Sequence, residues 1–166
     1  MAYIARSLSA LLDRTPADKA IVVFGARQTG KTTLLEHLFQ DRKVKWLSGD
    51  EPQDRELLTS LSSKADISIL LSGLDVLVID EAQRIQGIGM LLKRLEDSKP
   101  SCRIFATGSS SLELAGGVME SAAGRLWPMT LFPLSVTELA NHNSWLDVME
   151  SLPIRLTVGS YPEIVT

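Results

Sequence analysis

The chain has 166 residues, of which 45% are apolar and 22% are charged. These values match ordinary globular proteins, so they exclude a fibrous or disordered chain and allow one domain with its own core. The formal net charge of −3 gives no general attraction to nucleic acid or to an anionic membrane surface.

Neither a membrane span nor a disulfide is indicated. The apolar runs are of strand length, well short of the roughly 20 residues that a transmembrane helix needs. The single cysteine, Cys102, cannot form an internal disulfide and is most simply a small buried hydrophobic residue. We therefore expect a cytoplasmic protein without a membrane-bound part.

Strand and helix patterns alternate along the chain. Apolar runs predict strands over residues 20–24, 44–47, 76–79 and 103–106. Helix formers and leucines at helical spacing predict helices over residues 1–13, 32–40, 52–61, 63–72 and 88–97. In the last third we expect a strand over 126–131 and helices over 135–140 and 145–152. The alternation predicts an α/β fold, a three-layer sandwich with a mainly parallel sheet.

A phosphate-binding loop follows the first predicted strand. Residues 25–32 read GARQTGKT, which fits the pattern G-x-x-x-x-G-K-[ST] in full, between a strand and a helix. Glycines allow the backbone to fold around phosphate groups, and the helix N-terminus favours anions. We expect Lys31 to contact the β- and γ-phosphates and Thr32 to bind Mg²⁺. The predicted nucleotide-binding residues are Gly25, Ala26, Arg27, Gln28, Thr29, Gly30, Lys31, Thr32 and Thr33.

Two acids follow the strand predicted over residues 76–79. Asp80 and Glu81 stand at its carboxyl end, where open α/β sheets bind their ligands. Asp80 is predicted to hold the magnesium ion together with Thr32. Glu81 is the predicted catalytic base, which orients the attacking water and removes its proton.

Several other polar residues have two readings from sequence alone. Thr107 and Ser109 either position the attacking water or cap a turn. Gln83 either contacts the nucleotide or couples the site to a neighbouring element, and it could equally be an exposed loop residue. Arg27 and Arg125 are the cations available to stabilise transition-state charge, and each also fits a solvated surface position.

The remaining residues with metal-binding or stacking side chains do not indicate a second site. His37 and His142 have no further histidine or cysteine at ligand spacing, so a zinc site is not predicted. Trp46, Trp127 and Trp145 are expected in the core or at interfaces, because the acidic charge balance argues against base stacking.

Five segments together resemble a family of prokaryotic ATPases of the AAA superfamily. In chain order they read GARQTGKT (25–32), IDEAQ (79–83), ATGSS (106–110), AGR (123–125) and GSYPE (159–163). The resemblance implies a sheet of five parallel strands in the order 5-1-4-3-2. It also implies that Thr107 is a polar sensor of the nucleotide and that Arg125 is a nucleotide-sensing or finger arginine.

The motifs favour one function and leave others open. The leading hypothesis is Mg²⁺-dependent ATP binding and hydrolysis by a switch or motor module, with ATP or ADP bound in turn. The alternative is a nucleotide-gated module that binds protein or DNA with little turnover. A small-molecule or nucleotide kinase is disfavoured because no arginine-rich lid is found, and a GTPase because no Asn-Lys-x-Asp segment is present.

The expected partners follow from the same resemblance. We expect residues 1–166 to form an AAA-type ATPase domain, the N-terminal part of a longer protein, because family members usually continue into a C-terminal domain. A homo-oligomer is possible, in which case an arginine from a neighbouring copy would act at the site.

Overall fold

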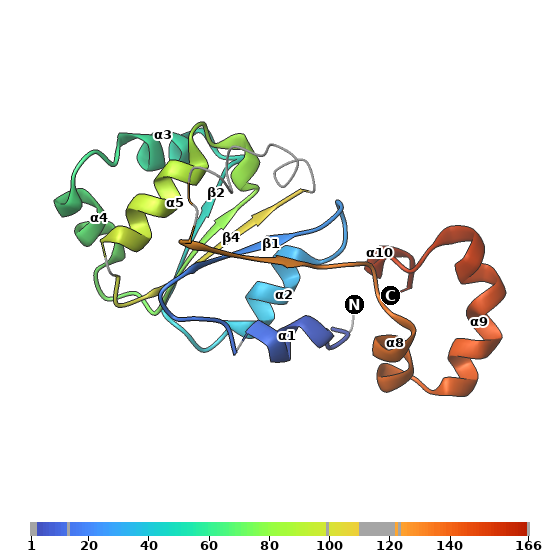
Figure 1. Ribbon diagram of the computed structural model, residues 1–166. Coiled ribbons are helices and arrows are strands. Elements are labelled where there is room, and N and C mark those ends of the chain that lie inside the picture. Colours follow the sequence, from blue (N-terminus) through green and yellow to red (C-terminus); the bar gives the residue numbers. More distant parts are fainter. Residues whose placement is uncertain (1–2, 13, 99, 110–121, 123, 166) are drawn as a thin grey trace.

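A five-stranded sheet forms the centre of the protein, and its described strands all run parallel (Figure 1). The computed structural model describes residues 3–12, 14–98, 100–109, 122 and 124–165. The strands are β1 (Ala20–Phe24), β2 (Val44–Ser48), β3 (Val76–Asp80), β4 (Arg103–Gly108) and β5 (Leu126–Thr130). Their order is β2-β3-β4-β1-β5, so the predicted order 5-1-4-3-2 is confirmed.

Helices connect the strands and extend beyond them. They are α1 (Ser7–Leu12), α2 (Lys31–Leu38), α3 (Pro52–Ser60), α4 (Lys64–Leu71), α5 (Ile88–Asp97), α8 (Val136–His142), α9 (Trp145–Val158) and α10 (Pro162–Val165). A 3₁₀ helix, η1 (Ala82–Arg84), follows β3. The helices α2 to α5 begin and end within two residues of their predicted bounds.

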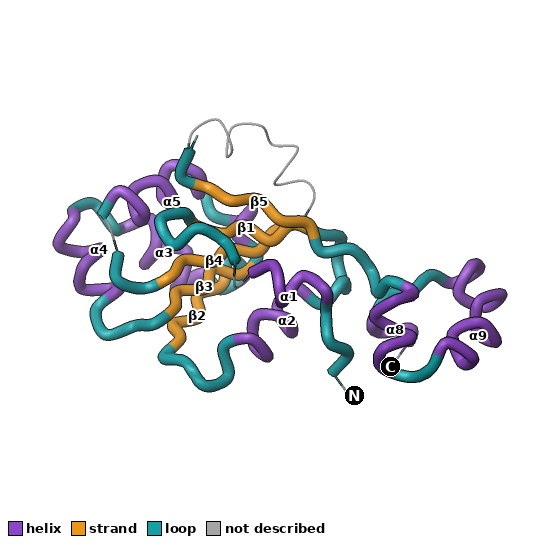
Figure 2. The backbone as a smooth tube through the Cα atoms, turned by 60° about the horizontal axis from the view of Figure 1, so that its bottom comes forward, coloured by secondary structure: helices purple, strands orange, loops and turns teal. Residues whose placement is uncertain are grey.

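The three central strands, β3, β4 and β1, are buried on both faces. In β1, Ile21 and Val23 pack with Leu34 of α2, whereas Val22 belongs to the cluster that contains Leu92 of α5. Figure 2 shows α1 and α2 on one side of the strands and α3, α4 and α5 on the other. Because successive strand residues point to opposite faces, a strand covered on both sides must be apolar throughout. The predicted three-layer sandwich is therefore confirmed.

The N-terminal helix is shorter than predicted. The amphipathic pattern predicted a helix over residues 1–13, but α1 begins at Ser7 and residues 3–6 are not helical; residues 1, 2 and 13 lie outside the described part. Tertiary contacts explain the difference. The ring of Tyr3 stacks on His37, and Arg6 donates hydrogen bonds to two distant carbonyl groups.

The helix α9 is longer than predicted. We expected it to end before Pro153, because proline removes a helix hydrogen bond. Instead it continues to Val158 and ends at Gly159, whose φ of 87° suits a glycine. Pro153 is exposed, so the carbonyl that loses its partner can bond to water.

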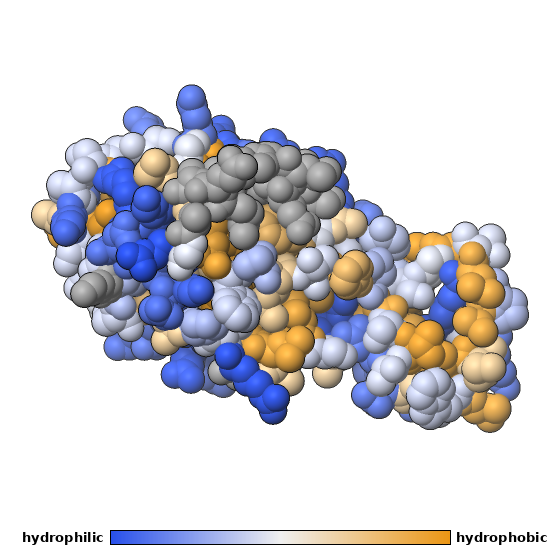
Figure 3. Space-filling view, viewed as in Figure 1, coloured by the Kyte–Doolittle hydropathy of each residue, from blue (hydrophilic) through white to orange (hydrophobic). Residues whose placement is uncertain are grey.

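The helices α8, α9 and α10 form a separate group beyond the end of β5 (Figure 1). A small core joins them to the N-terminal segment: Ile4, Leu134, Leu139, Ala140 and Val148, with Val165 packed against it. Apolar patches lie among polar ones on this group of helices (Figure 3), and the exposed apolar residues of α9 are Trp145, Leu146, Met149, Ile154, Leu156 and Val158. Within the part of the chain that is described, the helices are too short or too polar to cross a membrane.

A buried carboxyl group lies at the edge of the sheet where the strands begin. Glu96 is only 7% exposed, and burial, helped by nearby Asp18, raises its pKa to about 7. Arg125 and Arg103 act in the opposite direction without cancelling this effect. The folded protein therefore retains this proton at pH values where the unfolded chain releases it.

The raised pKa of Glu96 predicts a pH-dependent stability. Between about pH 4.5 and 7 the unfolded carboxyl ionises and the folded one does not, so wild-type stability falls as the pH rises through this range. As the pH rises from 4.5 to 8, the free energy of unfolding of Glu96→Gln should increase relative to that of the wild type by on the order of 2–3 kcal/mol. Urea unfolding at each pH measures this difference. Exposed Glu56→Gln is the control. If the two proteins differed in free energy of unfolding by the same amount at every pH in this range, the prediction would be contradicted.

Candidate functional site

The predicted phosphate loop connects β1 to α2. Two of its residues adopt left-handed backbone conformations, Gln28 with φ 63° and Gly30 with φ 86°. Gly25 is needed for a different reason, because an ideal Cβ there would lie 2.4 Å from the Leu131 carbonyl oxygen. The loop is therefore tightly folded, and it is close to the end of β5.

The ammonium group of Lys31 is held inside this loop. The residue is 6% exposed, and its Nζ donates hydrogen bonds to the carbonyl oxygens of Gly25 at 3.1 Å and Ala26 at 2.8 Å. Burial lowers the pKa of Lys31, and the opposing charges of Glu81 and Asp80 offset part of that effect. A cation that is largely removed from water interacts strongly with any anion placed beside it.

Asp80 lies between the hydroxyl groups of two threonines from different elements. Its Oδ2 accepts a hydrogen bond of 3.0 Å from Thr32 Oγ1, at the start of α2, and its Oδ1 accepts one from Thr107 Oγ1, at the end of β4. Carboxylate and hydroxyl oxygens are the hard ligands that Mg²⁺ prefers. The two predicted magnesium ligands, Thr32 and Asp80, are thus in direct contact.

Glu81 is fixed at both its backbone and its side chain. Its φ of 48° is left-handed, which is unusual for a residue with a side chain, and its N–H donates to Thr107 Oγ1 at 3.2 Å. The carboxylate accepts a hydrogen bond from Gln83, whose own Oε1 accepts one of 3.2 Å from the Ser109 N–H. Of the readings open for Gln83, the coupling of Glu81 to the end of β4 is the one that this geometry favours.

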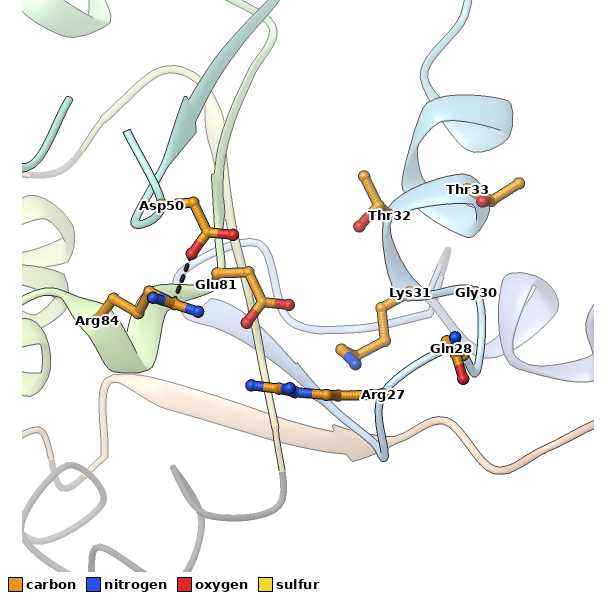
Figure 4. Close-up of a pocket in the computed structure, with 9 residues that line it drawn as sticks. All are labelled: Arg27, Gln28, Gly30, Lys31, Thr32, Thr33, Asp50, Glu81 and Arg84. Atoms are coloured by element: carbon orange, nitrogen blue, oxygen red, sulfur yellow. Dashed lines mark ion pairs between the residues drawn. The ribbon is translucent and has the colours of Figure 1, made fainter. Parts of the chain in front are cut away.

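A cavity of about 430 Å³ lies over the loop. In Figure 4 the side chains of Lys31, Arg27 and Glu81 extend into the same space, and Arg84 forms an ion pair with Asp50 at 2.5 Å. The lining residues are Arg27, Gln28, Gly30, Lys31, Thr32, Thr33, Asp50, Glu81 and Arg84. The loop, the start of α2 and the segment after β3 therefore face one polar space.

Three residues near the cavity were missed from the sequence. Asp50 follows β2 at the carboxyl edge of the sheet, so the position that identified Asp80 could have identified it too. Arg84 lies just beyond Gln83, without a distinguishing pattern. Arg6 is far from the loop in sequence, yet its Nη1 donates a hydrogen bond of 2.7 Å to the Thr29 carbonyl.

Arg125 does not join the site within one chain. Arg125 precedes β5, and its carbonyl accepts a hydrogen bond from the N–H of Ala20, the first residue of β1. The phosphate loop instead follows Phe24, the last residue of β1. Five strand residues, or roughly 15 Å, separate the two edges. Its guanidinium instead pairs with Asp97 at 2.6 Å. Ser110 and Ala123, from the segments that support the family resemblance, lie outside the described residues.

The sequence matches a known family of proteins. A family model described as an AAA domain matches residues 17–140, which is most of the chain and includes the loop, Asp80, Glu81 and Thr107. No curated protein matches the sequence.

Two solved structures have similar folds. One is a Signal Transduction ATPase with Numerous Domains (STAND) protein with a tetratricopeptide repeat sensor from Pyrococcus horikoshii, with a TM-score of 0.61, 12% identity and 96% of this chain covered. The other is PCH-2 of C. elegans, with a TM-score of 0.51, 16% identity and 89% covered. The chain spans 28% and 45% of those two proteins. At these identities the similarity shows the fold.

The position of Thr107 leads to a stability prediction. Thr107→Val keeps the shape but removes the hydroxyl that donates to Asp80 and accepts from the Glu81 N–H. Leaving buried polar partners unsatisfied should lower the free energy of unfolding by about 1–3 kcal/mol in urea. Thr59→Val, on the exposed surface of α3, should change it by less than about 0.5 kcal/mol. Equal stability of the two variants would show that the Thr107 contacts are not formed in solution.

Proposed function

Because this chain belongs to the AAA domain family, we propose that it binds ATP with Mg²⁺ and hydrolyses the bond between the β- and γ-phosphates. Family membership supports nucleotide binding of the ATPase type. The finer proposal is a switch or motor module in the cytoplasm, whose ATP and ADP states differ in the conformation of the attached segments.

The contact between Thr32 and Asp80 is the observation that supports this proposal most strongly. It joins the start of α2 to the end of β3 at 3.0 Å, and Thr32 and Lys31 line the cavity that Glu81 also faces. A bound Mg²⁺ would neutralise charge on the phosphate oxygens. The oxygens of Thr32 and Asp80 fit such an ion, because hard cations select carboxylate and hydroxyl ligands.

The other residues of the site supply positioning and charge. Lys31 presents a buried ammonium to the phosphates, and the N–H groups of the loop and of the first turn of α2 bind their oxygens. Glu81 orients the attacking water and accepts its proton. Gln83 holds the Glu81 carboxylate, while Thr107 fixes both Asp80 and the Glu81 backbone.

Arg125 has a place in this proposal only through a neighbouring copy. Its side chain is 48% exposed at the far edge of the sheet, so it is accessible to another subunit. A planar, permanently charged guanidinium stabilises developing negative charge well. In a homo-oligomer Arg125 is thus the finger arginine.

The test is steady-state ATP hydrolysis by the wild type and by matched pairs of variants. Lys31→Ala should abolish ATP binding, whereas Lys45→Ala, on an exposed position of β2, should not. Glu81→Gln should retain binding but lower kcat by about 10²- to 10⁴-fold, and exposed Glu56→Gln should leave kcat unchanged.

The possible results separate the candidate functions. Turnover lost in both site variants would establish a hydrolase. Binding that depends on Lys31 without any turnover would favour the nucleotide-gated binding module. Turnover that survives Glu81→Gln undiminished would remove Glu81 from its proposed role.

A further inference from the structure

The N-terminal segment, residues 3–6, lies between the nucleotide site and the C-terminal helices. On one side the Tyr3 ring stacks on His37 of α2, with the ring centroids 3.8 Å apart. On the other side Ile4 is 6% exposed and packs in the small core of α8 and α9, with Leu139 and Val148. The segment therefore contacts both parts of the molecule.

Arg6 bonds simultaneously to both parts through one guanidinium. Nη1 donates to the Thr29 carbonyl of the phosphate loop at 2.7 Å, and Nη2 donates at 2.5 Å to the Phe132 carbonyl, in the connection between β5 and α8. The Arg6 side chain is only 5% exposed. Arginine can bridge two fixed acceptors in this way because its donors form a rigid planar fork, which lysine lacks.

The contact with Thr29 also determines the direction of a neighbouring N–H group. The Thr29 carbonyl and the Gly30 N–H belong to one planar trans peptide, so they point in opposite directions. When Arg6 fixes the carbonyl on its own side, the Gly30 N–H is directed away from Arg6. Gly30 lines the cavity, where N–H groups of such a loop bind phosphate oxygens.

Glu138, at the first turn of α8, completes the connection. Its Oε1 lies 3.3 Å from Arg6 Nε and accepts a hydrogen bond of 2.7 Å from the Ser7 N–H, while Oε2 accepts one of 2.9 Å from Ser135. Burial alone would raise the pKa of Glu138, but the hydrogen bonds from Ser135 and Ser7 and the charge of Arg6 lower it below its usual value. The start of α8 is thus fixed to an ionised pair.

The last short helix also borders the loop. An ideal Cβ built on Gly30 would lie 3.7 Å from Arg6 Nη1 and 3.7 Å from Pro162 Cγ in α10. The Leu134 N–H, just before α8, donates to the Ser160 carbonyl at 2.8 Å, so the connection before α8 and the one before α10 are joined. Arg6 and Pro162 therefore border the space beside Gly30 that a side chain would occupy.

We propose that Arg6, hydrogen-bonded to Thr29 and Phe132 and ion-paired with Glu138, is a positioning residue that couples the phosphate loop to the helices α8 to α10. The coupling rests on the proposed nucleotide binding. Bound phosphate stabilises one orientation of the Thr29–Gly30 peptide, and Arg6 transmits that preference to the start of α8. By linkage, the placement of α8 changes nucleotide affinity by the same factor.

A purely structural role for the pair makes a different prediction. Buried ion pairs are weak evidence for stability, since apolar replacements often stabilise a protein as well. If Arg6 only holds the fold together, its replacement loosens α8 equally with and without nucleotide. If Arg6 couples the two parts, the effect of the nucleotide on α8 disappears.

The experiment measures ATP affinity and amide hydrogen exchange on the full chain. In the wild type, saturating Mg²⁺-ATP should slow exchange of the α8 amides at least about fivefold. Arg6→Lys keeps a positive charge beside Glu138 but cannot bridge both carbonyls. It should weaken ATP binding about tenfold and reduce the nucleotide effect on α8 to less than about twofold, even at saturating ATP.

Two further variants make the result decisive. Arg42→Lys, at an exposed position, is the matched control and should resemble the wild type. Glu138→Gln keeps one acceptor oxygen, replaces the other with an amide NH2 group, which donates, and removes the charge beside Arg6. This variant is used if Arg6→Lys does not fold. In it the effect of ATP on α8 exchange should likewise fall below about twofold.

The outcomes distinguish the coupling from the proposed function. Binding of ATP that requires Lys31, together with an undiminished nucleotide effect on α8 in Arg6→Lys or in Glu138→Gln, would overturn the coupling and leave the function standing. A wild type that binds ATP without any change in α8 would also overturn the coupling. A wild type that does not bind ATP would overturn both.

Discussion

The parallel direction of β1, β3 and β4 determines where the chemistry of this protein can occur. Strands that run the same way end at the same edge, so the phosphate loop after β1, the acids after β3 and Thr107 at the end of β4 meet although they are far apart in sequence. The contact of Thr32 with Asp80 follows directly. An antiparallel β3 would place Asp80 at the opposite edge of the sheet, where the strands begin, away from the loop.

The same alignment brings the site into close contact with other connections of the chain. The close approach of Gly25 to the Leu131 carbonyl ties the loop to the end of β5, and the chain continues from there towards α8. Glu81 is similarly close to Gly49, where an ideal Cβ would lie 2.3 Å from the Glu81 carbonyl oxygen. The loop and Glu81 are therefore packed tightly against neighbouring connections of the chain.

Much of the fold could be predicted from sequence because burial on both faces requires continuous apolar strands, and the loop has a fixed glycine spacing. The contacts of Arg6 could not be predicted, because its hydrogen-bond partners are backbone carbonyl groups, which every residue has. The predicted end of α9 was wrong because an exposed proline is tolerated inside that helix. The predicted start of α1 was wrong because Tyr3 and Arg6 make tertiary contacts instead of helical ones. Arg125 could be singled out from sequence as a cation, but its position at the edge of the sheet where the strands begin could not be predicted.

We propose that the loop and Asp80 form one site for a nucleotide and a magnesium ion. Calorimetric titration of the wild type with ATP, with Mg²⁺ and then with a chelator in its place, tests this claim most directly. We expect binding of one ATP per chain that weakens at least about tenfold when Mg²⁺ is removed, because Thr32 and Asp80 then lose their shared ligand. Equal affinity in both titrations, or no binding in either, would contradict it.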